Sequence, residues 1–420
     1  MKIAVLVYRL NGIGGIAKHL LLLCRELVDM GHTVDIYAVE YDPSRCYPEL
    51  ARGLNIRSLR TPKPLSGDMY RVPVGRRMLI YLAQLWQAYL DQRRLSALLP
   101  SGYDIVNPHG DYVDWAAAIY KRREGASAIW MCNDFWPPVE DLSSGLRGIA
   151  KLKAWVKKPL VFPFERYDRW AVRSMDRIVV LSTKVQSQMQ DHYHVASTVI
   201  RTGIVAPPID LPSVKTNADS QFELLTICAL MPRRRIEDVL QALSLLKAAK
   251  QKFHYTVVGQ LDHTPSYTSF LQAEVGRLHL EDCVTFTGEV SDKALITYFQ
   301  ECDAFVWPAD EAQSWGMACM EAMTCGKPVL VSRANGLAEV LHDEQDALLF
   351  DSRNPQKLAD AILRIASDQQ LRDRIALQGQ TLIREQYSWR RNAEAMLHLF
   401  SDAFHEHSLS ASLSTEAALK

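Results

Sequence analysis

Short apolar segments alternate with helix-like segments along almost the whole chain, and this alternation limits the folds it can adopt. In the first half, the segments that read as buried strands are residues 2–8, 33–39, 104–107, 128–132 and 177–181. In the second half they are residues 223–228, 254–258, 284–287, 303–307, 328–331 and 347–350. Strands that alternate with helices form parallel sheets with helices on both faces. We therefore expect an α/β protein with doubly wound, Rossmann-like parallel sheets.

A segment rich in Pro, Ser and Asp, residues 206–220, separates the two halves. Its composition is that of a linker, and a chain of 420 residues is longer than one hydrophobic core usually serves. We expect an N-terminal domain over 1–205, a hinge over 206–220, a C-terminal domain over 221–390, and a final helix with a disordered tail over 391–420. Ligands bind such sheets at the carboxyl ends of the strands, so we expect these ends to face each other across a cleft.

Charge and cysteine content exclude several classes of protein. The 48 Lys and Arg residues balance 48 Asp and Glu residues, whereas general nucleic-acid binding needs a surplus of positive charge. The 8 cysteines form no C-x-x-C pair, which is typical of buried thiols in a reducing compartment. No apolar run approaches the length of a membrane span, and the N-terminus runs directly into glycines, unlike a signal peptide. We expect a soluble protein of the cytoplasm.

One region departs from this neutrality. Residues 147–177 carry nine basic residues against three acidic ones, interleaved with Trp155, Phe162, Phe164 and Trp170. Basic residues among aromatics can hold a peripheral protein on an anionic membrane surface. A solvated helix with core aromatics would have the same composition. Both interpretations stay open. Membrane contact would place the protein on the inner face of the membrane.

A glycine-rich turn (GIGGIA, residues 12–17) follows the first predicted strand and opens a helix. Gly14 and Gly15 let the backbone approach a ligand, and the helix N-terminus offers unpaired N–H groups with a positive partial charge. The turn matches the looser G-x-G-x-x-A form of a dinucleotide fingerprint, with Glu40 as a candidate ribose ligand. A dehydrogenase, a sugar-nucleotide enzyme and a plain tight turn all stay open at this point.

A second motif, within residues 313–328, follows the predicted strand 303–307. A helix is expected to begin between residues 315 and 317, so that its first N–H groups, around Gly316 and Met317, suit a diphosphate. Glu321 then lies about one turn inside the helix, where its carboxylate can accept ribose hydroxyls, and Gln313 lies in the preceding loop. An isolated helical glutamate is usually a surface residue, but the strand–loop–helix context favours ligand binding.

Three consecutive arginines, Arg233, Arg234 and Arg235, follow the first strand of the second half. Guanidinium groups at the carboxyl end of a strand can neutralise a pyrophosphate leaving group. A solvated run of charge is the alternative, and the position of the arginines favours the phosphate role.

These segments together resemble the retaining glycosyltransferases of family 4, which have the B-type glycosyltransferase fold (GT-B). The resemblance runs from GGIAKHLLLLCRELVDMGHTVDIY (14–37) through ALMPRRRIEDVLQAL (229–243), VTFTGEVSD (284–292) and QSWGMACMEAMTCGKPVLVSRANGLAEV (313–340) to residues 387–389. It implies transfer of a sugar from a nucleotide-sugar donor, with retention at the anomeric carbon and no required metal. The chain has no Asp-X-Asp pair that would hold a divalent ion on the diphosphate. Arginines and helix N-termini would then carry that charge.

Two of the family's donor-site positions differ in this chain. The E-x7-E motif reads Gln313-x7-Glu321, so the ribose ligand is kept and the carboxylate that meets the donor sugar is an amide. Glutamine can bind sugar hydroxyls but cannot act as a nucleophile or base, which favours front-face attack by the acceptor. The family's Arg and Lys diphosphate clamp falls at Ala229 and Arg234, with Arg233 and Arg235 as substitutes.

The cleft histidine of the family aligns with Asn133. The resemblance therefore implies that Asn133 or Asp134 binds sugar hydroxyls. His109, at another strand end, is the remaining histidine candidate, and a structural role for it is equally open.

The leading expectation is a metal-independent hexosyltransferase that acts on a UDP- or GDP-sugar and a glycan or lipid-linked acceptor, in assembly of surface polysaccharide or lipopolysaccharide. Three departures, at Ala229, Asn133 and Gln313, keep open a nucleotide-sugar-binding protein without turnover. An NAD-dependent oxidoreductase that uses the glycine-rich turn and Glu40 is the third alternative. No motif points to a lysine that would hold pyridoxal phosphate.

Overall fold

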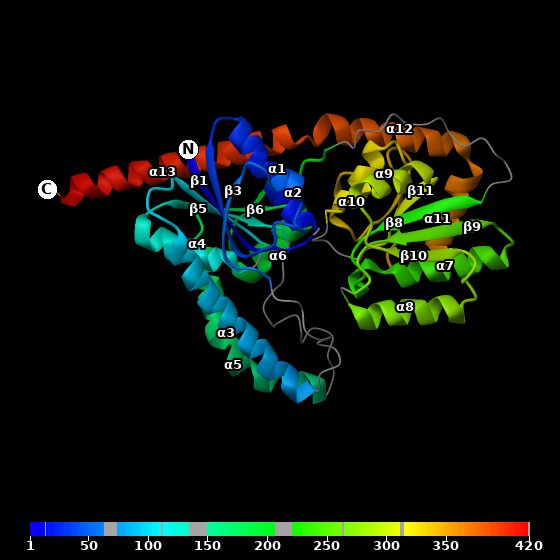
Figure 1. Cartoon of the computed structure of the whole chain (residues 1–420), viewed down its shortest axis with the longest axis horizontal. Coiled ribbons are helices and arrows are strands. Elements are labelled where there is room, and N and C mark those ends of the chain that lie inside the picture. The colour runs from blue at the N-terminus through cyan, green and yellow to red at the C-terminus, as the bar shows by residue number, and fades with distance from the viewer. Residues whose placement is uncertain are drawn as a thin grey trace. The chain divides into compact units, whose positions relative to one another are not determined.

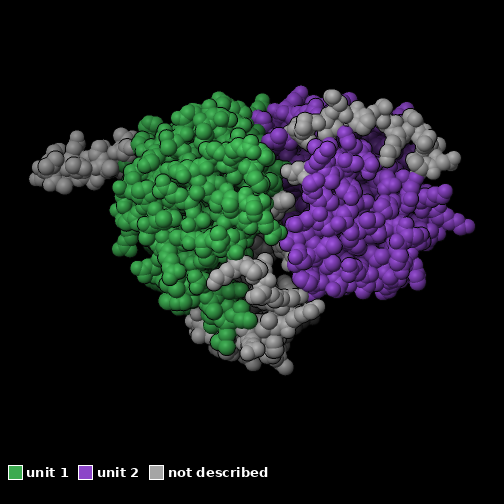
Figure 2. Space-filling model, viewed as in Figure 1, with its two compact units in different colours: residues 1–201, 389–420 green, residues 202–388 purple. Residues whose placement is uncertain are grey.

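The computed structural model describes residues 1–12, 14–62, 74–110, 112–133, 149–205, 221–262, 264–310 and 315–418, with side chains except at 74–78, 149–160, 292 and 408–418. The chain forms two compact units, shown in Figure 2: unit 1 comprises residues 1–201 and 389–420, and unit 2 comprises residues 202–388. The predicted linker, residues 206–220, lies outside the described residues. The return of the chain to unit 1 at residue 389 was not predicted.

Unit 1 is built on a 7-stranded parallel sheet. Its strands are β1 (Lys2–Leu10), β2 (Thr33–Tyr41), β3 (Asn55–Arg60), β4 (Ile105–His109), β5 (Ser127–Cys132), β6 (Arg177–Val180) and β7 (Thr198–Val199). Their order is β3-β2-β1-β4-β5-β6-β7. The strands predicted from sequence are confirmed. The edge strands β3 and β7 were missed because β3 is largely exposed and β7 has 2 residues.

The helices of unit 1 are α1 (Gly15–Asp29), α2 (Pro48–Ala51), α3 (Val74–Leu98), α4 (Val113–Glu124), α5 (Ile149–Arg173), α6 (Thr183–Tyr193) and α13 (Trp389–Ala418). Helix α1 buries one apolar face and ends as predicted, since Gly31 has a φ of 87° that only glycine adopts without strain. Helix α13 contacts α1 and β5, and the Ser127 hydroxyl donates to the Ala403 carbonyl at 3.2 Å. The helix runs to Ala418, whereas a disordered tail was expected from about residue 406.

Unit 2 repeats this plan with a 6-stranded parallel sheet in the order β10-β9-β8-β11-β12-β13. The strands are β8 (Phe222–Ile227), β9 (Phe253–Val258), β10 (Val284–Gly288), β11 (Ala304–Trp307), β12 (Val329–Ser332) and β13 (Leu348–Phe350). The helices are α7 (Ile236–Ala248), α8 (Pro265–Arg277), α9 (Asp292–Glu301), α10 (Met317–Thr324), α11 (Pro355–Ser367) and α12 (Gln369–Gln386), with short 3₁₀ turns η2 (Pro232–Arg234) and η3 (Gly336–Glu339). In Figure 1, α7 and α8 lie on one side of this sheet and α9 and α10 on the other.

All predicted strands of unit 2 are present, which confirms the expected α/β class with two doubly wound parallel sheets. The cysteines also follow the prediction: all are free thiols, and all except the half-buried Cys283 are buried. Within the described part of the chain, no helix is long and apolar enough to cross a membrane.

A buried ion cluster attaches α3 to the carboxyl end of the unit 1 sheet. Arg60, at the end of β3, donates to both carboxylate oxygens of Asp91 on α3, at 2.7 and 3.0 Å, and to Glu40 at 2.9 Å. Asp91 is 0% exposed. Burial alone would raise its pKa, but the hydrogen bonds from Arg60, Gln87 and Tyr8 outweigh burial and hold the pKa of Asp91 below its ordinary value.

We expect Asp91→Ala to lower the free energy of unfolding by about 1–3 kcal/mol, because Arg60 then loses a buried charged acceptor. Urea unfolding measures this loss. Since the folded-state pKa of Asp91 is depressed, its contribution is present above the unfolded-state pKa and disappears as the pH falls through the folded-state pKa. The exposed Asp29, at the end of α1, provides the control substitution Asp29→Ala. Equal stability of the two variants at neutral pH would contradict the prediction.

Candidate functional site

The carboxyl edge of the unit 2 sheet is where the strand order reverses. Strands β8 and β11 lie side by side at its centre, and their connections leave toward opposite sides. In open parallel sheets, ligands bind at such a switch point, outside the carboxyl ends of the strands. Turn η2 with Arg233 and Arg234 follows β8, and α10 with Glu321 follows β11. The chain therefore brings two of the predicted motifs to one edge.

Helix α10 begins as predicted, at Met317. Its capping residue, Gly316, has left-handed angles (φ 72°, ψ 49°) and no side chain that could bond the first N–H groups of the helix. No acidic residue lies in the first turn. Glu321 lies in the second turn and is 9% exposed. The start of α10 is therefore suited to bind an anion. Gln313, the other predicted residue of this motif, lies outside the described residues.

One indole ring joins η2 to α10. Trp307 is the last residue of β11 and is 4% exposed. The guanidinium carbon of Arg234 lies 5.2 Å from the centre of its ring, within the range of a cation–π contact. A Cβ added to Gly316 would lie 3.0 Å from the indole nitrogen, closer than ordinary van der Waals contact. Trp307 was not among the predicted site residues, although its place as the last strand residue before the loop was visible.

The three arginines have different surroundings. Arg235 forms ion pairs with Glu237 at 2.7 Å and with Asp238 at 2.6 Å. Burial opposes its charge, but these carboxylates outweigh burial and raise its pKa. The backbone carbonyl of Arg233 accepts a hydrogen bond from the Asp310 N–H at 3.0 Å, which attaches η2 to the segment after β11. Arg235 therefore stabilises the start of α7, and Arg234 lies against Trp307.

A further glycine at this edge escaped the sequence analysis. Gly259 follows β9 with a φ of 141°, and a Cβ there would lie 2.0 Å from the carbonyl oxygen of Cys228. Only a hydrogen atom fits, because the neighbouring atom belongs to the backbone. Ala229, at the position of the family's arginine, is the residue directly after this close approach.

In unit 1, the two glycines at the start of α1, Gly14 and Gly15, are exposed. Gly14 caps the helix in an extended conformation (φ −174°), and its N–H donates to the Tyr47 hydroxyl at 3.1 Å. Among the described residues, and apart from its neighbours in the chain, no atom lies within 4 Å of a Cβ added to Gly14. Neither strain nor close packing within unit 1 therefore requires this glycine. Gly15 is the first residue of α1.

Glu40 was the candidate ribose ligand of the oxidoreductase alternative. It lies near the end of β2 and is 9% exposed. Its carboxylate forms ion pairs with Arg60 at 2.9 Å and with Arg9 at 3.3 Å. The acceptor oxygens that a ribose would need are thus already engaged with two guanidinium groups.

His109 ends β4 and is buried in unit 1. Its Nε2 donates to the Asn107 Oδ1 at 2.7 Å, and the Asn107 amide donates to the Ile129 carbonyl at 2.6 Å. This relay leaves Nδ1 as an acceptor, with no hydrogen-bond partner among the described residues. Burial, and to a smaller extent the neighbouring ring of His19, lowers the pKa of His109 well below its ordinary value. A neutral imidazole results, and its role in a site stays a prediction.

Asn133 directly follows β5, next to β4 in the sheet, and is 6% exposed. Its side-chain nitrogen has no hydrogen-bond partner among the described residues. His109 and Asn133 therefore lie at strand ends, as the sequence predicted, and the two strands are neighbours in the sheet. Asp134 lies outside the described residues.

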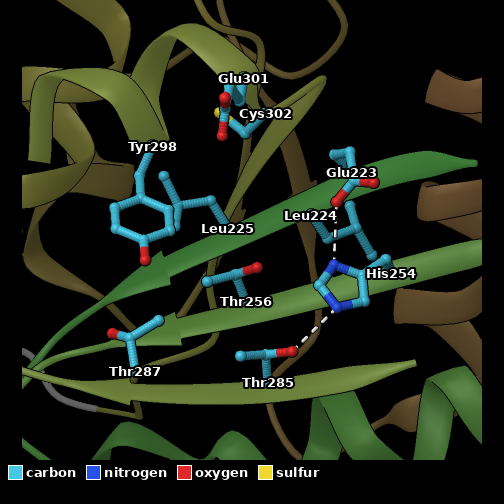
Figure 3. Close-up of a pocket in the computed structure, with 10 residues that line it drawn as sticks. All are labelled: Glu223, Leu224, Leu225, His254, Thr256, Thr285, Thr287, Tyr298, Glu301 and Cys302. Carbon is cyan, nitrogen blue, oxygen red and sulfur yellow. Dashed lines mark hydrogen bonds and ion pairs between the residues drawn. The ribbon is translucent and has the colours of Figure 1, made fainter. Parts of the chain in front are cut away.

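A pocket of about 320 Å³ opens elsewhere on unit 2, on one face of β8, β9 and β10 beside α9 (Figure 3). His254, on β9, lines this pocket, and its Nδ1 lies 2.9 Å from the Glu223 carboxylate and its Nε2 3.0 Å from the Thr285 hydroxyl. All three residues stand second in their strands, far from the carboxyl edge. Because these polar groups bond one another, we interpret the pocket as a solvated polar face.

No group of three or more His, Cys, Asp or Glu side chains is arranged to hold a metal ion in the part of the chain that the structure describes. The metal-independence expected from sequence stays a prediction.

Two family models match adjoining parts of the chain. One, described as Glycosyltransferase Family 4, matches residues 13–206, and the other, described as Glycosyl transferases group 1, matches residues 210–381. Together they cover the sheet of unit 2 and all strands of the unit 1 sheet except β1.

Relatives and solved structures agree with these matches. A D-inositol 3-phosphate glycosyltransferase of Paenarthrobacter aurescens is 24% identical over 240 residues, covering 54% of this chain and 57% of the relative. The first curated relatives are matched over only 57–58% of their own length. The Anabaena protein HepE, in complex with UDP and glucose, has a TM-score of 0.68 at 17% identity, with 96% of this chain and 100% of that chain covered. Sucrose-phosphate synthase from Thermosynechococcus elongatus has a TM-score of 0.71 at 18% identity, with 96% and 99% covered.

The contact between Gly316 and Trp307 predicts the effect of adding one methyl group. We expect Gly316→Ala to lose about 1–2 kcal/mol of unfolding free energy from the left-handed backbone alone, and a further loss from the indole contact. The control is Gly288→Ala, which has a similar φ of 78° but only the Leu261 side chain, at 4.0 Å, near the added Cβ. Chemical denaturation compares the two. An equal loss in both variants would show that the indole contact contributes nothing.

Proposed function

Because the chain belongs to the family 4 glycosyltransferases with the GT-B fold, we propose that it transfers a hexose-type sugar from a UDP- or GDP-sugar to a hydroxyl group. The proposed acceptor is a glycan or a lipid-linked glycan in cell-surface polysaccharide or lipopolysaccharide assembly. The proposed reaction retains the anomeric configuration and needs no metal ion. The reaction takes place in the cytoplasm, where such donors are made.

The observation that carries this proposal is the contact of one indole with both donor-side motifs of unit 2. Arg234 lies over Trp307, and the glycine that caps α10 lies against the same ring. We assign Arg234 and the first N–H groups of α10, from Gly316 and Met317 onward, to the donor diphosphate. We assign the buried Glu321 to the ribose hydroxyls. Gln313 and Arg233 complete the proposed donor side, and Gly14, Gly15, His109, Asn133 and Asp134 form the proposed acceptor side.

The proposed chemistry follows from the side chains available. Position 313 is an amide, so it forms no covalent glycosyl-enzyme. The acceptor hydroxyl oxygen bonds to the anomeric carbon on the face from which the diphosphate leaves, and the carbon–oxygen bond to the phosphate breaks. The hydroxyl proton passes to the departing phosphate oxygen. Arg234 stabilises the negative charge that grows on this leaving group.

A protein that binds nucleotide sugars without turnover is the alternative favoured by Ala229, Asn133 and Gln313. The two functions differ in one measurable product. Incubation with a panel of nucleotide sugars releases UDP or GDP only if the donor is turned over, and release that requires the lipid extract shows transfer instead of hydrolysis. Donor binding without nucleotide release across the panel would favour the alternative. A thermal-shift screen with UDP, GDP, ADP and their sugars identifies the base first, since ligand binding raises the melting temperature.

The proposed assignment of Glu321 predicts that Glu321→Ala lowers kcat/KM at least about tenfold, the loss expected when a buried charged hydrogen bond to the ribose disappears. Nucleotide release with the identified donor measures this change, and the melting temperature shows whether the variant folds. Glu385→Ala, on the exposed face of α12, is the matched control. Near-normal turnover of a folded Glu321→Ala variant would remove the ribose assignment.

We also propose contact with an anionic membrane, through a surface wider than the predicted segment 147–177. Helices α3 and α5 pack side by side in unit 1 (Figure 1), and the rings of Trp86 and Phe164 lie 6.3 Å apart. Exposed apolar side chains on these helices include Leu79, Ile80, Trp86 and Phe162, and exposed arginines include Arg93, Arg94, Arg166 and Arg173. We call these eight residues the α3–α5 surface.

The charges of the α3–α5 surface suit anionic lipid. The carboxylates among the described side chains of the two helices, Asp91, Glu165 and Asp168, are 0%, 8% and 8% exposed. The exposed charges on these side chains are therefore all positive. Each basic side chain near an anionic surface contributes roughly 1 kcal/mol, and the neighbouring apolar side chains can enter the interface.

We expect the double substitution Trp86→Ser/Phe162→Ser to lower partitioning onto phosphatidylglycerol-containing vesicles at least about tenfold, because two exposed apolar side chains no longer enter the interface. Vesicle flotation measures the bound fraction. Leu377→Ser, which removes a 65% exposed leucine from α12, is the matched control. Binding that is equal on neutral phosphatidylcholine vesicles, or unchanged by the double substitution, would contradict the proposal.

A further inference from the structure

Trp307 contacts the two donor-side elements but has no role in the mechanism above. We propose that Trp307 is a positioning residue: its indole face holds the Arg234 guanidinium in the orientation that binds the donor diphosphate. This inference rests on the proposed function, because it takes Arg234 as a diphosphate ligand. It also gives a reason for an arginine at a position where the family has a lysine.

The ring of Trp307 is itself fixed in place. Strand β11 pairs with β8 on one side and with β12 on the other, so its backbone is held in the middle of the sheet. Phe305, two residues earlier on the same strand, stacks against Trp307 with ring centres 6.3 Å apart and planes at 20°. Gly316 closes the edge of the indole that carries the nitrogen. A group that rests on this ring therefore has a fixed support.

Arg234 and Trp307 are matched in chemistry. A guanidinium is planar and weakly hydrated, so it can lie on an aromatic face and still direct N–H groups at a phosphate. A lysine ammonium is a compact, strongly hydrated charge on a flexible stem, and an indole would orient it less well. The lysine-to-arginine change at position 234 is thus conservative in charge but not in geometry, and the neighbouring tryptophan supplies what the geometry needs.

The face of the ring matters more here than its N–H group. The indole nitrogen of Trp307 is buried and has no hydrogen-bond partner among the described residues. Replacement by phenylalanine therefore removes no hydrogen bond within that part of the chain, and it keeps an aromatic face of smaller attraction for a cation. Replacement by leucine keeps an apolar side chain and removes the face. The proposed loss of diphosphate affinity should therefore be smaller in Trp307→Phe than in Trp307→Leu.

A double-mutant cycle tests the proposal on the full chain. The variants are Trp307→Leu, Arg234→Lys and the two combined, and the readout is the Kd of the nucleoside diphosphate that wild type binds, by isothermal titration calorimetry. We expect Trp307→Leu to weaken binding roughly two- to thirty-fold in the arginine background, the range of a cation–π contact, and much less in the lysine background. Trp307→Phe restores part of the affinity.

The control separates this effect from general loss of packing. Phe222 on β8 carries Arg372 over its ring at 5.7 Å, in the same unit but at the amino end of a strand. Phe222→Leu removes a comparable contact and leaves diphosphate affinity unchanged. Melting temperatures accompany every Kd, and the cycle with Trp307→Phe is used if Trp307→Leu does not fold.

The outcomes distinguish failure of the positioning role from failure of the proposed function. Non-additive losses, with partial recovery in Trp307→Phe, support the positioning role. If wild type binds the nucleoside diphosphate and the losses of affinity in the two single variants add up to the loss in the double variant, the positioning role is overturned. The proposed function then stays intact. Absence of nucleoside diphosphate binding in wild type overturns the proposed function and the inference with it.

Discussion

The proposed donor side of unit 2 depends on the contact of Trp307 with two elements that follow different strands. Turn η2 comes after β8 and α10 comes after β11, and these strands are neighbours at the point where the sheet order reverses. Topology alone brings the two loops to one edge, but it does not orient their side chains. The buried indole does so, because one ring bounds both the Arg234 guanidinium and the glycine turn that starts α10.

The two sheets have equivalent strand orders but different chemistry at their carboxyl edges. In unit 1 the polar groups at this edge mostly bond one another: Glu40 pairs with Arg60 and Arg9, and His109 donates to Asn107. In unit 2 the edge presents a helix start without a side-chain cap and an arginine held over a ring. The positive partial charge of this helix start and the charge of Arg234 therefore lie at the same edge of unit 2, which agrees with the donor site proposed there.

The strands, the class of fold and the start of α10 were predictable because each depends on local pattern: apolar runs, glycines and strand–loop–helix order. The different environments of Arg234 and Arg235 were only partly predictable. The Arg235–Asp238 pair spans three residues and is a local signal, whereas Trp307 lies 73 positions after Arg234 and only the folded sheet brings them together. The same limit applies to Gly259, whose neighbour is the backbone of Cys228, and to α13, whose sequence does not reveal that it packs on unit 1.

The departures from the family pattern compensate one another in charge. The pattern places an arginine, a lysine and two glutamates around the donor, with a formal sum of zero. This chain has Ala229, Arg234, Gln313 and Glu321 at those positions, which also sum to zero, since one cation and one anion are absent together. Loss of the cation alone would leave the diphosphate less neutralised, and loss of the anion alone would leave extra positive charge around the departing nucleotide and slow its release. The paired change preserves the net charge around the proposed donor site. This favours a site that still binds and turns over its donor, in preference to one that has lost turnover.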